Sequence, residues 1–437
     1  YVNIIFLLYD MKYTRLPSAV FTKHRQRFMA KLKPNSIAVF NANDIYPISA
    51  DSTLPFEQHR DLFYLTGVDQ EETILVLCPD AKDPKQQETV FVRETNAHIA
   101  VWEGHKLTKG ETAAVTGIDN VQWTSDFKAS FLALAKQAEN IYINTNEHYR
   151  AKVETQTRED RFIAWCKEQF PKKNYEKSNF ILQELRGVKD PEEIAHIQQA
   201  CDITEKGFKR VLGFVKPGVW EFEIEAVFAH EFLRNRSKGF AYTPIIASGA
   251  NSNVLHYIEN SQQCQAGELI LMDVGAEYGN YSSDMTRTIP VSGRFSPRQR
   301  AVYEAVLKVK DEATQLLMPG VLWKAYHIEV GKLMSSALID LKLLTKNEVS
   351  ENAEAYKKYF MHGTSHHLGL DTHDYGLLDE PMQPNMVFTV EPGIYIPKEG
   401  FGIRLEDDVV VQASGAPVNL MANIPIDPDE IEGLMNP

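Results

Sequence analysis

The chain has 437 residues, of which 43% are hydrophobic and 24% are charged, and its formal net charge is −13. The length indicates more than one domain, and the composition excludes a disordered or fibrous protein. The acidic balance also disfavours nucleic acid as a partner, because phosphate binding requires a basic face.

Cysteine use and hydropathy indicate a cytoplasmic protein. The four cysteines lie far apart and form no C-x-x-C pair, which is typical of reduced thiols. The apolar run over residues 2–9 is too short to span a bilayer and lacks the flanks of a signal peptide. No other segment approaches that length, so we expect no membrane partner. Met11 would be a more natural start, and we therefore expect residues 1–10 to be an upstream extension.

Helical and strand patterns alternate over residues 11–175. Such alternation predicts an α/β domain with a parallel or mixed sheet, and we find no catalytic constellation in it. We expect a linker over residues 176–189. The predicted helices are 18–32 and 127–137, and the predicted strands are 37–40, 73–77, 89–92 and 141–143.

A second domain, residues 190–437, opens with a helix signal and then repeats it. Asp190 is an N-cap followed by proline and two glutamates, and Ser296 followed by proline opens another long helix. Both helices end in a Pro-Gly-Val phrase, at 217–219 and 319–321, before another helix, a histidine-bearing segment and an acidic ribbon. We therefore expect an α+β domain with an internal pseudo-twofold repeat around a shared site. The alternative is two unrelated helix–hairpin units.

The first acidic ribbon pairs the strand over 268–275 with its return over 281–289. A turn centred on 278–279 places Asp273 directly opposite Asp284. Their Cβ atoms would lie about 5 Å apart, where like charges destabilise a sheet. Asp273 also follows an apolar run typical of a buried strand, and a buried carboxylate must be paired or bind a metal. We therefore expect a cation between the two carboxylates.

The second ribbon pairs residues 386–391 with 401–406 and places Glu391 opposite Glu406, unless a bulge at Pro392 shifts the register. Nearby, residues 362–374 hold four of the 13 histidines, which predicts a nitrogen ligand beside the acids. Four carboxylates and an imidazole form a hard ligand set that suits Mn²⁺, with Fe²⁺, Co²⁺ and Zn²⁺ as alternatives. Four carboxylates exceed the need of one ion, so we expect two divalent ions about 3.5–4 Å apart.

Five motifs, listed below in chain order, resemble those of the pita-bread metallopeptidases. Within that family they resemble most closely the motifs of the aminopeptidase P (Xaa-Pro aminopeptidase) group. The resemblance extends over nearly all of the chain after residue 11, including the phrase Asp-Leu-Phe-Tyr-Leu-Thr-Gly at 61–67. Five ordered motifs are far more specific than one short pattern. The motifs are Asp-Val-Gly-x-Glu-Tyr from 273, Ser-Asp-Met-Thr-Arg-Thr from 283, His-Gly-x-Ser-His-x-x-Gly-Leu-Asp-x-His-Asp from 362, Glu-Pro-Gly-Ile-Tyr-Ile from 391 and Gly-Ile-Arg-x-Glu-Asp-Asp from 402.

The resemblance implies five metal ligands, with Asp284 and Glu406 bridging two ions. Asp273 would hold one ion, and His366 with Glu391 would hold the other. The adjacent His367 then occupies a position where the family varies, and we expect it not to bind. The implied ligands are Asp273, Asp284, His366, Glu391 and Glu406.

The resemblance also implies a hydrolase that removes the first residue from peptides whose second residue is proline. A hydroxide between the metals would attack the scissile carbonyl. His256 and His373 would stabilise the developing charge, and Glu391 would pass a proton to the leaving nitrogen. Arg404 matches a substrate-site arginine of the family; from the residues alone, pairing with a ligand carboxylate was the expected role.

Two further aromatic residues are candidates for substrate binding. Together with His362, Tyr395 would form the pocket for proline, or it would be an ordinary strand aromatic. Trp102 would contact the site of a neighbouring subunit in a homodimer or homotetramer, or pack on its own domain.

Two other functions compete with this hypothesis. An Xaa-Pro dipeptidase (prolidase) shares the fold and all five ligands but requires a free carboxylate directly after proline. A catalytically silent pita-bread binding module would have lost ligands and would purify without metal. A methionine aminopeptidase should lack the large N-terminal domain, and a creatinase-like enzyme should lack the full ligand set.

Overall fold

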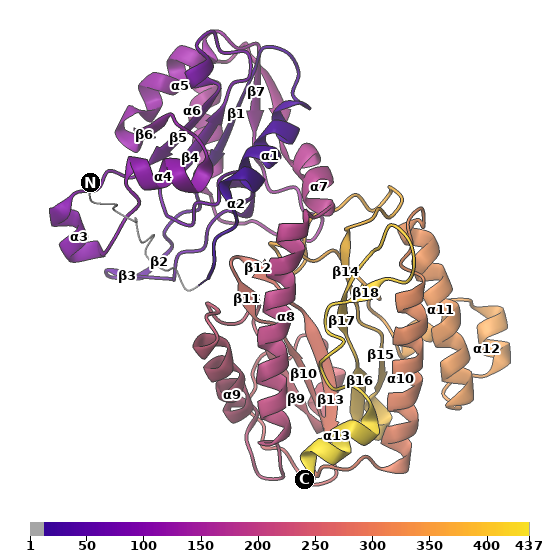
Figure 1. The fold of residues 1–437 in the computed structure, drawn as a ribbon. Helices are drawn as coiled ribbons and strands as arrows, with labels where there is room; N and C mark the ends of the chain where they lie inside the picture. Colours follow the sequence, from indigo (N-terminus) through magenta and orange to yellow (C-terminus); the bar gives the residue numbers. More distant parts are fainter. Residues whose placement is uncertain (1–12, 437) are drawn as a thin grey trace. The chain divides into compact units, whose positions relative to one another are not determined.

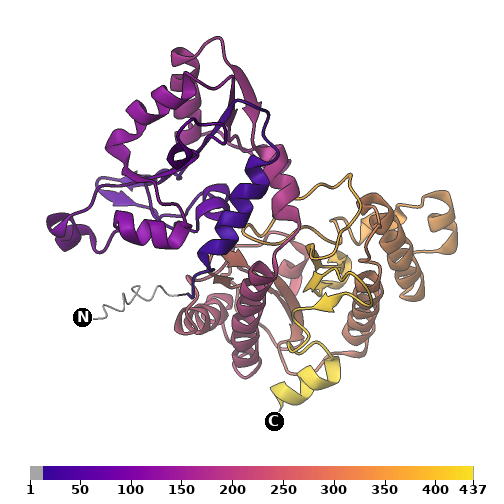
Figure 2. The same cartoon turned by 45° about the horizontal axis from the view of Figure 1, so that its top comes forward.

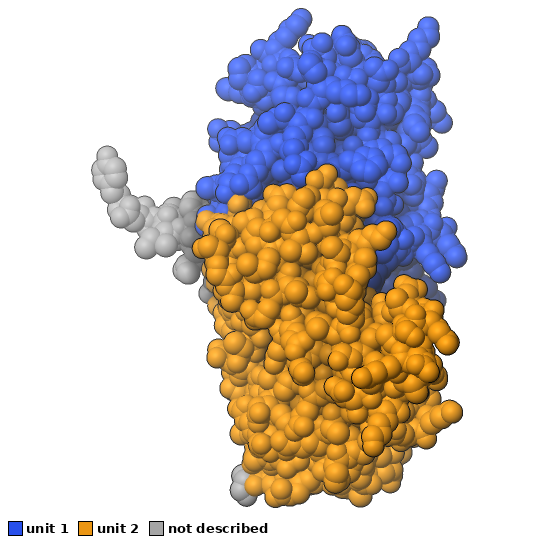
Figure 3. All heavy atoms as spheres, turned by 90° about the vertical axis from the view of Figure 1, so that its right-hand side faces the viewer, with its two compact units in different colours: residues 1–11, 15–186 blue, residues 12–14, 187–437 orange. Residues whose placement is uncertain are grey.

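The computed structural model describes residues 13–436, which form two compact units. Unit 1 contains residues 15–186, and unit 2 contains residues 13–14 and 187–436; Figure 3 colours them separately. The expected extension, residues 1–10, lies outside the described residues. Among residues 13–436, every helix is too short or too polar to cross a bilayer.

Unit 1 contains a mixed sheet with helices around it (Figure 1). The strand order is β6-β5-β4-β1-β7-β8, and β4 runs antiparallel to both of its neighbours while the other pairs are parallel. The expected α/β domain with a mixed sheet is thus confirmed. Its core places Val39, Phe91 and Phe131 among the fully buried side chains. The strands are β1 (Ser36–Asn41), β2 (Pro47–Ser49), β3 (Ser52–Thr53), β4 (Ile74–Leu77), β5 (Glu88–Val92), β6 (Val121–Trp123), β7 (Asn140–Ile143) and β8 (Asn174–Lys177).

The helices of unit 1 include one in the segment that we expected to be a linker. Residues 176–189 contain α7, and its Arg186 donates to Asp61 at 2.8 Å in a pair that is almost fully buried. An ion pair without solvent holds its two elements together, so most of this segment belongs to unit 1. The helices are α1 (Ser18–Met29), α2 (Arg60–Thr66), α3 (Ala97–Glu103), α4 (Lys109–Thr116), α5 (Phe127–Ala135), α6 (Arg158–Gln169) and α7 (Asn179–Gly187).

Unit 2 repeats one arrangement, a helix pair followed by an antiparallel ribbon (Figures 1 and 2). In the first half α8 packs on α9 before the sheet β13-β10-β9, and in the second half α10 packs on α11 before the sheet β14-β17-β18. This order agrees with the expected α+β domain with an internal repeat. The helices are α8 (Pro191–Leu212), α9 (Glu221–Arg234), η3 (Gly249–Asn253), α10 (Pro297–Gln315), α11 (Trp323–Asp340), α12 (Lys346–Glu351) and α13 (Pro428–Met435). The strands are β9 (Ile245–Ser248), β10 (Leu269–Val274), β11 (Glu277–Tyr278), β12 (Tyr281–Ser282), β13 (Met285–Pro290), β14 (Val387–Val390), β15 (Gly393–Ile396), β16 (Phe401–Arg404), β17 (Asp407–Val410) and β18 (Val418–Asn419).

The predicted register of the first ribbon is wrong by two residues. Asp273 pairs with Thr286, because the two-residue turn is Gly279-Asn280. Both turn residues have positive φ, +59° and +69°, as the tight hairpin turns that match strand twist require. A shift of two residues keeps every side chain on its predicted face. Asp284 therefore becomes the diagonal neighbour of Asp273 and still lies on its side of the ribbon.

The predicted register of the second ribbon is confirmed on both sides of the acids. Val390 pairs with Asp407 and Gly393 pairs with Arg404, so no bulge intervenes. Glu391 and Glu406 lie across from each other in the short interval between these paired strands.

A buried charge cluster joins the two ribbons. Asp407 on β17 contacts Arg287 of β13 at 2.6 Å and Lys310 of α10 at 2.5 Å, and all three are buried. Burial alone would raise the pKa of Asp407, but the two cations outweigh it and hold that pKa below its ordinary value. Arg287 also donates to the carbonyl oxygen of Glu406 at 2.6 Å, so the cluster fixes the backbone beside a candidate ligand.

We predict that Lys310→Met lowers the free energy of unfolding by about 3 kcal/mol, since removing one partner leaves a buried charge less compensated. The matched control is Lys308→Met on the same helix, because Lys308 is exposed and reaches Glu312 only at 3.9 Å. That control should change stability by less than about 0.5 kcal/mol. Urea denaturation followed by circular dichroism measures both, and equal effects would contradict the prediction.

Candidate metal centre

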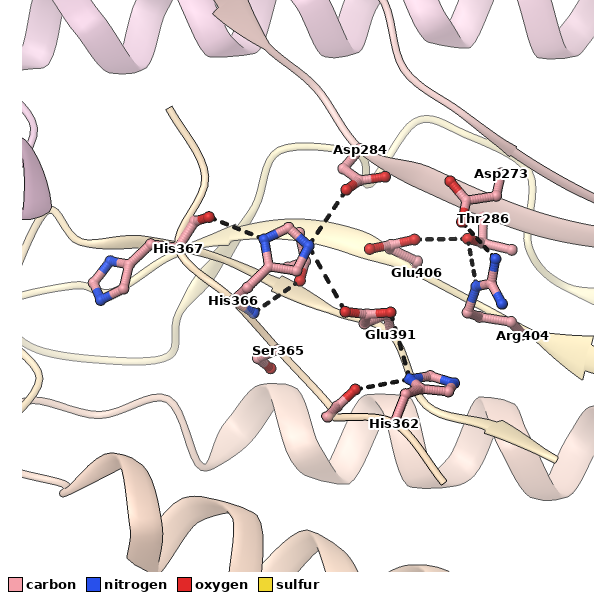
Figure 4. A network of polar contacts seen from close by, with 12 residues as sticks. Asp273, Asp284, Thr286, His362, Ser365, His366, His367, Glu391, Arg404 and Glu406 are labelled. Carbon is pink, nitrogen blue, oxygen red and sulfur yellow. Dashed lines mark hydrogen bonds and ion pairs between the residues drawn. The ribbon is translucent and has the colours of Figure 1, made fainter. Parts of the chain in front are cut away.

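Four carboxylates from the two ribbons converge on one region of unit 2. Asp273 lies on β10, Asp284 directly precedes β13, Glu391 directly follows β14 and Glu406 directly precedes β17. Figure 4 shows their side chains gathered together, with Glu406 between His366 on one side and Asp273 on the other. Ligand atoms of Asp284, His366 and Glu406 lie within 4.8 Å of one another, close enough to share an ion.

Tyr242 connects the two carboxylates of the first ribbon. Its hydroxyl lies 2.6 Å from Asp273 Oδ1 and 2.5 Å from Asp284 Oδ1. A hydroxyl has one proton to donate, so Tyr242 donates to only one of the two carboxylates at a time. Burial and the two carboxylates raise the pKa of Tyr242 well above its ordinary value, so the phenol remains protonated.

The imidazole of His366 is oriented as a metal ligand. Its Nδ1 lies 2.9 Å from the carbonyl oxygen of His367 and donates to it, so Nε2 is the nitrogen that is directed at the carboxylates. Nε2 faces Asp284 Oδ2 at 3.4 Å and Glu391 Oε1 at 3.7 Å. The ring of His367 instead points away from the carboxylates and stacks on Trp323, and burial lowers its pKa to about 3. This geometry favours His366 over His367 as the nitrogen ligand.

The carboxylates repel one another where little water can screen them. Burial and Asp273 raise the pKa of Asp284, and burial and Asp284 raise that of Glu406, both well above the ordinary range. Burial also raises the pKa of Glu391 to about 7, even though His366 and Arg404 act in the opposite direction. One guanidinium does not neutralise four carboxylates. The donor set and its unmet negative charge therefore fit divalent cations with hard ligands.

Arg404 anchors a chain of hydrogen bonds along one side of the cluster. Its Nη2 lies 2.5 Å from Asp273 Oδ2, and its Nη1 donates to the Tyr395 hydroxyl at 2.7 Å. That hydroxyl lies 2.7 Å from Nε2 of His362, whose Nδ1 donates to the Gly363 carbonyl oxygen at 2.9 Å. Burial lowers the pKa of His362 to about 3, so the ring is neutral and its Nε2 accepts a hydrogen bond from the Tyr395 hydroxyl.

This chain assigns Tyr395 and Arg404 internal roles. Tyr395 is fully buried, and its hydroxyl connects His362 with Arg404, while its place in a pocket for proline stays a prediction. Arg404 is almost fully buried and pairs with a candidate ligand, as the residues alone suggested. Burial would lower the pKa of Arg404, but Tyr395, Asp273 and the other carboxylates outweigh burial and raise it.

The other candidates lie at exposed positions. His373 is exposed, and its ring meets that of His366 edge-on with centroids 4.4 Å apart. His256 is exposed in the turn after η3, near enough to His362 to lower its pKa together with burial and Arg404. Trp102 lies on α3 of unit 1 with 79% of its surface exposed.

Sequence reasoning missed residues that form hydrogen bonds to the candidate ligands and so fix their orientation. Thr286 Oγ1 donates to Glu406 Oε2 at 2.6 Å and accepts from Arg404 Nε at 3.1 Å. Asp408 Oδ2 accepts the backbone N–H of Asp284 at 3.0 Å. Each lies two positions after a ligand, and this spacing of two was the available signal. Tyr242 has no such signal, because it belongs to no motif and lies 31 residues from Asp273.

Two family models together match most of the chain. The model described as "Metallopeptidase family M24" matches residues 195–413, and "Aminopeptidase P, N-terminal domain" matches residues 21–142. The Xaa-Pro aminopeptidase of Escherichia coli K12 is 33% identical over 431 residues, which cover 95% of this chain and 97% of the relative. Xaa-Pro aminopeptidase 3 of Homo sapiens is 32% identical over 405 residues, covering 90% and 79%.

Solved structures match over the same length. Aminopeptidase PepP of Pseudomonas aeruginosa has a TM-score of 0.88 and 30% identity, covering 96% of this chain and 98% of that one. Zn-substituted E. coli aminopeptidase P, in complex with product, has a TM-score of 0.87 and 31% identity, covering 97% and 99%. Both likenesses extend through the two units rather than over one of them.

The raised pKa values predict how metal and pH act together on stability. Carboxyl groups with raised folded-state pKa values bind protons that the unfolded chain releases, so the metal-free protein loses stability as pH rises from about 4 to about 7. Bound cations replace those protons. We therefore expect added divalent metal to raise the Tm of chelated protein more at pH 8 than at pH 5. Thermal scans at both pH values test this, and an equal gain would contradict it.

Proposed function

The chain belongs to metallopeptidase family M24 and resembles aminopeptidase P over its whole length, and on this premise we propose how its residues cleave peptides. The protein is a hydrolase that removes the first residue from peptides with proline in the second position. The observation that carries this function is the gathering of every expected ligand in a chain that matches such enzymes from end to end.

We propose that the five ligands hold two divalent ions, with Mn²⁺ as the native metal. Asp284 and Glu406 lie centrally and would be shared, Asp273 would bind one ion, and His366 with Glu391 would bind the other. When bound, such ions lower the pKa of water from 15.7 to about 7 and polarise a carbonyl group. The hard donor set supports Mn²⁺ over softer metals.

The exposed histidines face the substrate in this proposal. His256 and His373 donate hydrogen bonds to the carbonyl oxygen as negative charge develops on it. Glu391 passes a proton to the proline nitrogen, because a proton-transferring carboxylate must be accessible to the substrate. Its side chain is 19% exposed, compared with 14% for Asp273 and 7% for Asp284. His362 lies 3.6 Å from Glu391 and contacts the proline ring as a neutral, apolar-bodied side chain.

The preference for proline has a physical reason. An Xaa-Pro bond is a tertiary amide with a fixed φ and no N–H. A site that makes no hydrogen bond to that nitrogen before cleavage loses nothing when proline occupies the position, and a neutral His362 suits an apolar ring.

We also propose a homodimer or homotetramer in a cytoplasmic setting. The exposure of Trp102, a large aromatic side chain, supports a contact with a neighbouring subunit's site. All four cysteines are buried and unpaired, which supports a reducing compartment.

The two competing functions are less well supported. Two bacterial relatives that match nearly the whole chain are Xaa-Pro aminopeptidases, so prolidase is not favoured. A metal-free binding module would be expected to have lost ligands, whereas this chain retains all five.

We expect cleavage of an Xaa-Pro-Xaa peptide after its first residue, loss of cleavage on chelation and recovery with Mn²⁺. Hydrolysis of Gly-Pro and of the longer peptide, followed by mass spectrometry, measures this directly. Cleavage of the dipeptide alone would indicate prolidase, and cleavage of neither by Mn²⁺-loaded protein would contradict the catalytic function.

We predict that His373→Ala lowers kcat about 100-fold without loss of bound metal, because a donor to the developing charge is removed. The matched control is His367→Phe, six residues earlier in the same loop, which preserves stacking on Trp323 and should retain activity. Peptidase kinetics and metal analysis of both variants test the assignment, which fails if the two variants behave alike.

A further inference from the structure

His256 has a proposed catalytic role, but no polar contact of its own ring among residues 13–436 fixes its position. Its side chain is exposed, and no hydrogen bond or ion pair of its ring is found among residues 13–436. The position of the ring therefore depends on the backbone of the loop over residues 249–262. Where that backbone is fixed decides where the imidazole lies.

The front of this loop is fixed against β16. The hydroxyl of Ser252 accepts the backbone N–H of Gly402 at 2.7 Å and donates to the Gly249 carbonyl oxygen at 2.5 Å. A Cβ at Gly402 would lie 2.5 Å from the carbonyl oxygen of Ser252, so the two backbones touch. This contact precedes His256 by four residues and joins the loop to the strand that carries Arg404.

The back of the loop is fixed by one buried carboxylate, Glu221 at the start of α9. Its Oε1 accepts the backbone N–H and the hydroxyl of Ser248, both at 2.7 Å. Its Oε2 accepts the Tyr257 hydroxyl and the backbone N–H of Gln262, both at 2.8 Å. Glu221 is fully buried, so water does not compete for these four charge-assisted bonds.

These bonds connect the histidine to the sheet of the metal ligands. Tyr257 directly follows His256, and its ring packs in a buried cluster with Leu271 and Tyr395. Ser248 ends β9, which pairs with β10, the strand of Asp273. Glu221 thus sets the distance between the His256 loop and the strand that carries a proposed metal ligand.

We propose that Glu221 is a positioning residue for peptide hydrolysis and acts through His256. This inference rests on the proposed function of His256. Glu221 touches neither the ligands nor the exposed face of the loop, so its effect passes through the Tyr257 hydroxyl and the Gln262 N–H. A displacement of about 1 Å in a catalytic group can lower a rate about 100-fold.

Glu221→Gln is the sharpest variant, because it preserves shape and removes charge. Whichever way the new amide lies, its NH₂ group meets the backbone N–H of Ser248 or of Gln262, and that bond is lost. The matched control is Glu223→Gln on the same helical turn, since Glu223 caps its own helix at the Trp220 N–H and does not touch the loop. Tyr257→Phe removes the hydroxyl that donates to Glu221 at 2.8 Å and accepts the Ser261 N–H at 3.4 Å, and this variant serves if Glu221→Gln folds poorly.

We expect Glu221→Gln to lower kcat for an Xaa-Pro-Xaa peptide about 10- to 100-fold, with metal content unchanged and a smaller effect on KM. In a His256→Ala background the same substitution should add almost no further loss of kcat, because both changes disable one unit. Glu223→Gln should leave kcat unchanged in either background. Equal fold-losses with and without His256, or an unchanged kcat in Glu221→Gln, would overturn the proposal.

Hydrogen exchange separates this inference from the proposed function. Deuterium uptake over residues 249–262 should rise in Glu221→Gln and Tyr257→Phe but not in Glu223→Gln, whether or not the protein cleaves peptides. If wild-type protein cleaved no Xaa-Pro peptide, the proposed function would be refuted, while increased uptake would still support the role of Glu221 in holding the loop. Unchanged uptake in Glu221→Gln would refute that role.

Discussion

Confining four carboxylates where water is scarce is the constraint on which the structure depends. Two like charges 4 Å apart repel by about 4 kcal/mol at an effective dielectric constant of 20. Folding must therefore supply protons, a guanidinium or divalent cations to offset this repulsion. Burial and like charges raise the pKa of Asp284 and of Glu406, Tyr242 connects the carboxylates of the first ribbon, and Arg404 pairs with Asp273. Divalent cations would offset the remaining negative charge.

The fold resists this repulsion by fixing the backbone behind the ligands. The two ribbons meet where the Glu406 N–H donates to the Thr286 carbonyl oxygen at 3.0 Å. Directly behind this contact, Asp407 is held between Arg287 and Lys310. A charge cluster of opposite signs thus lies beside a cluster of like signs. The cluster of opposite charges fixes the strands, and the cluster of like charges favours the binding of divalent cations.

Chemistry at the front of the site is assigned to exposed side chains on loops. His256 and His373 are exposed, whereas His366 and Glu406 are buried. Loops carry substrate chemistry well only when a rigid scaffold positions them. For His256 we assign this positioning to the buried carboxylate of Glu221, which bonds to the loop at Tyr257 and Gln262. Buried charge therefore fixes the loop of His256 as it also fixes the backbone beside the candidate ligands.

The sequence by itself predicted five candidate ligands, and strand alternation predicted that the two acids of each ribbon lie on one face, because both patterns are local properties. It also determined the register of the second ribbon, where the pairing is the same on both sides of Glu391. It could not determine the first register, since either of two adjacent turns keeps Asp273 and Asp284 on one face, and the positive φ of Gly279 and Asn280 decided between them. Only the tertiary structure revealed Tyr242, Lys310 and Glu221 as partners of distant groups. A buried charge takes its partner from whatever the fold brings near, and such pairing leaves no periodic pattern in the chain.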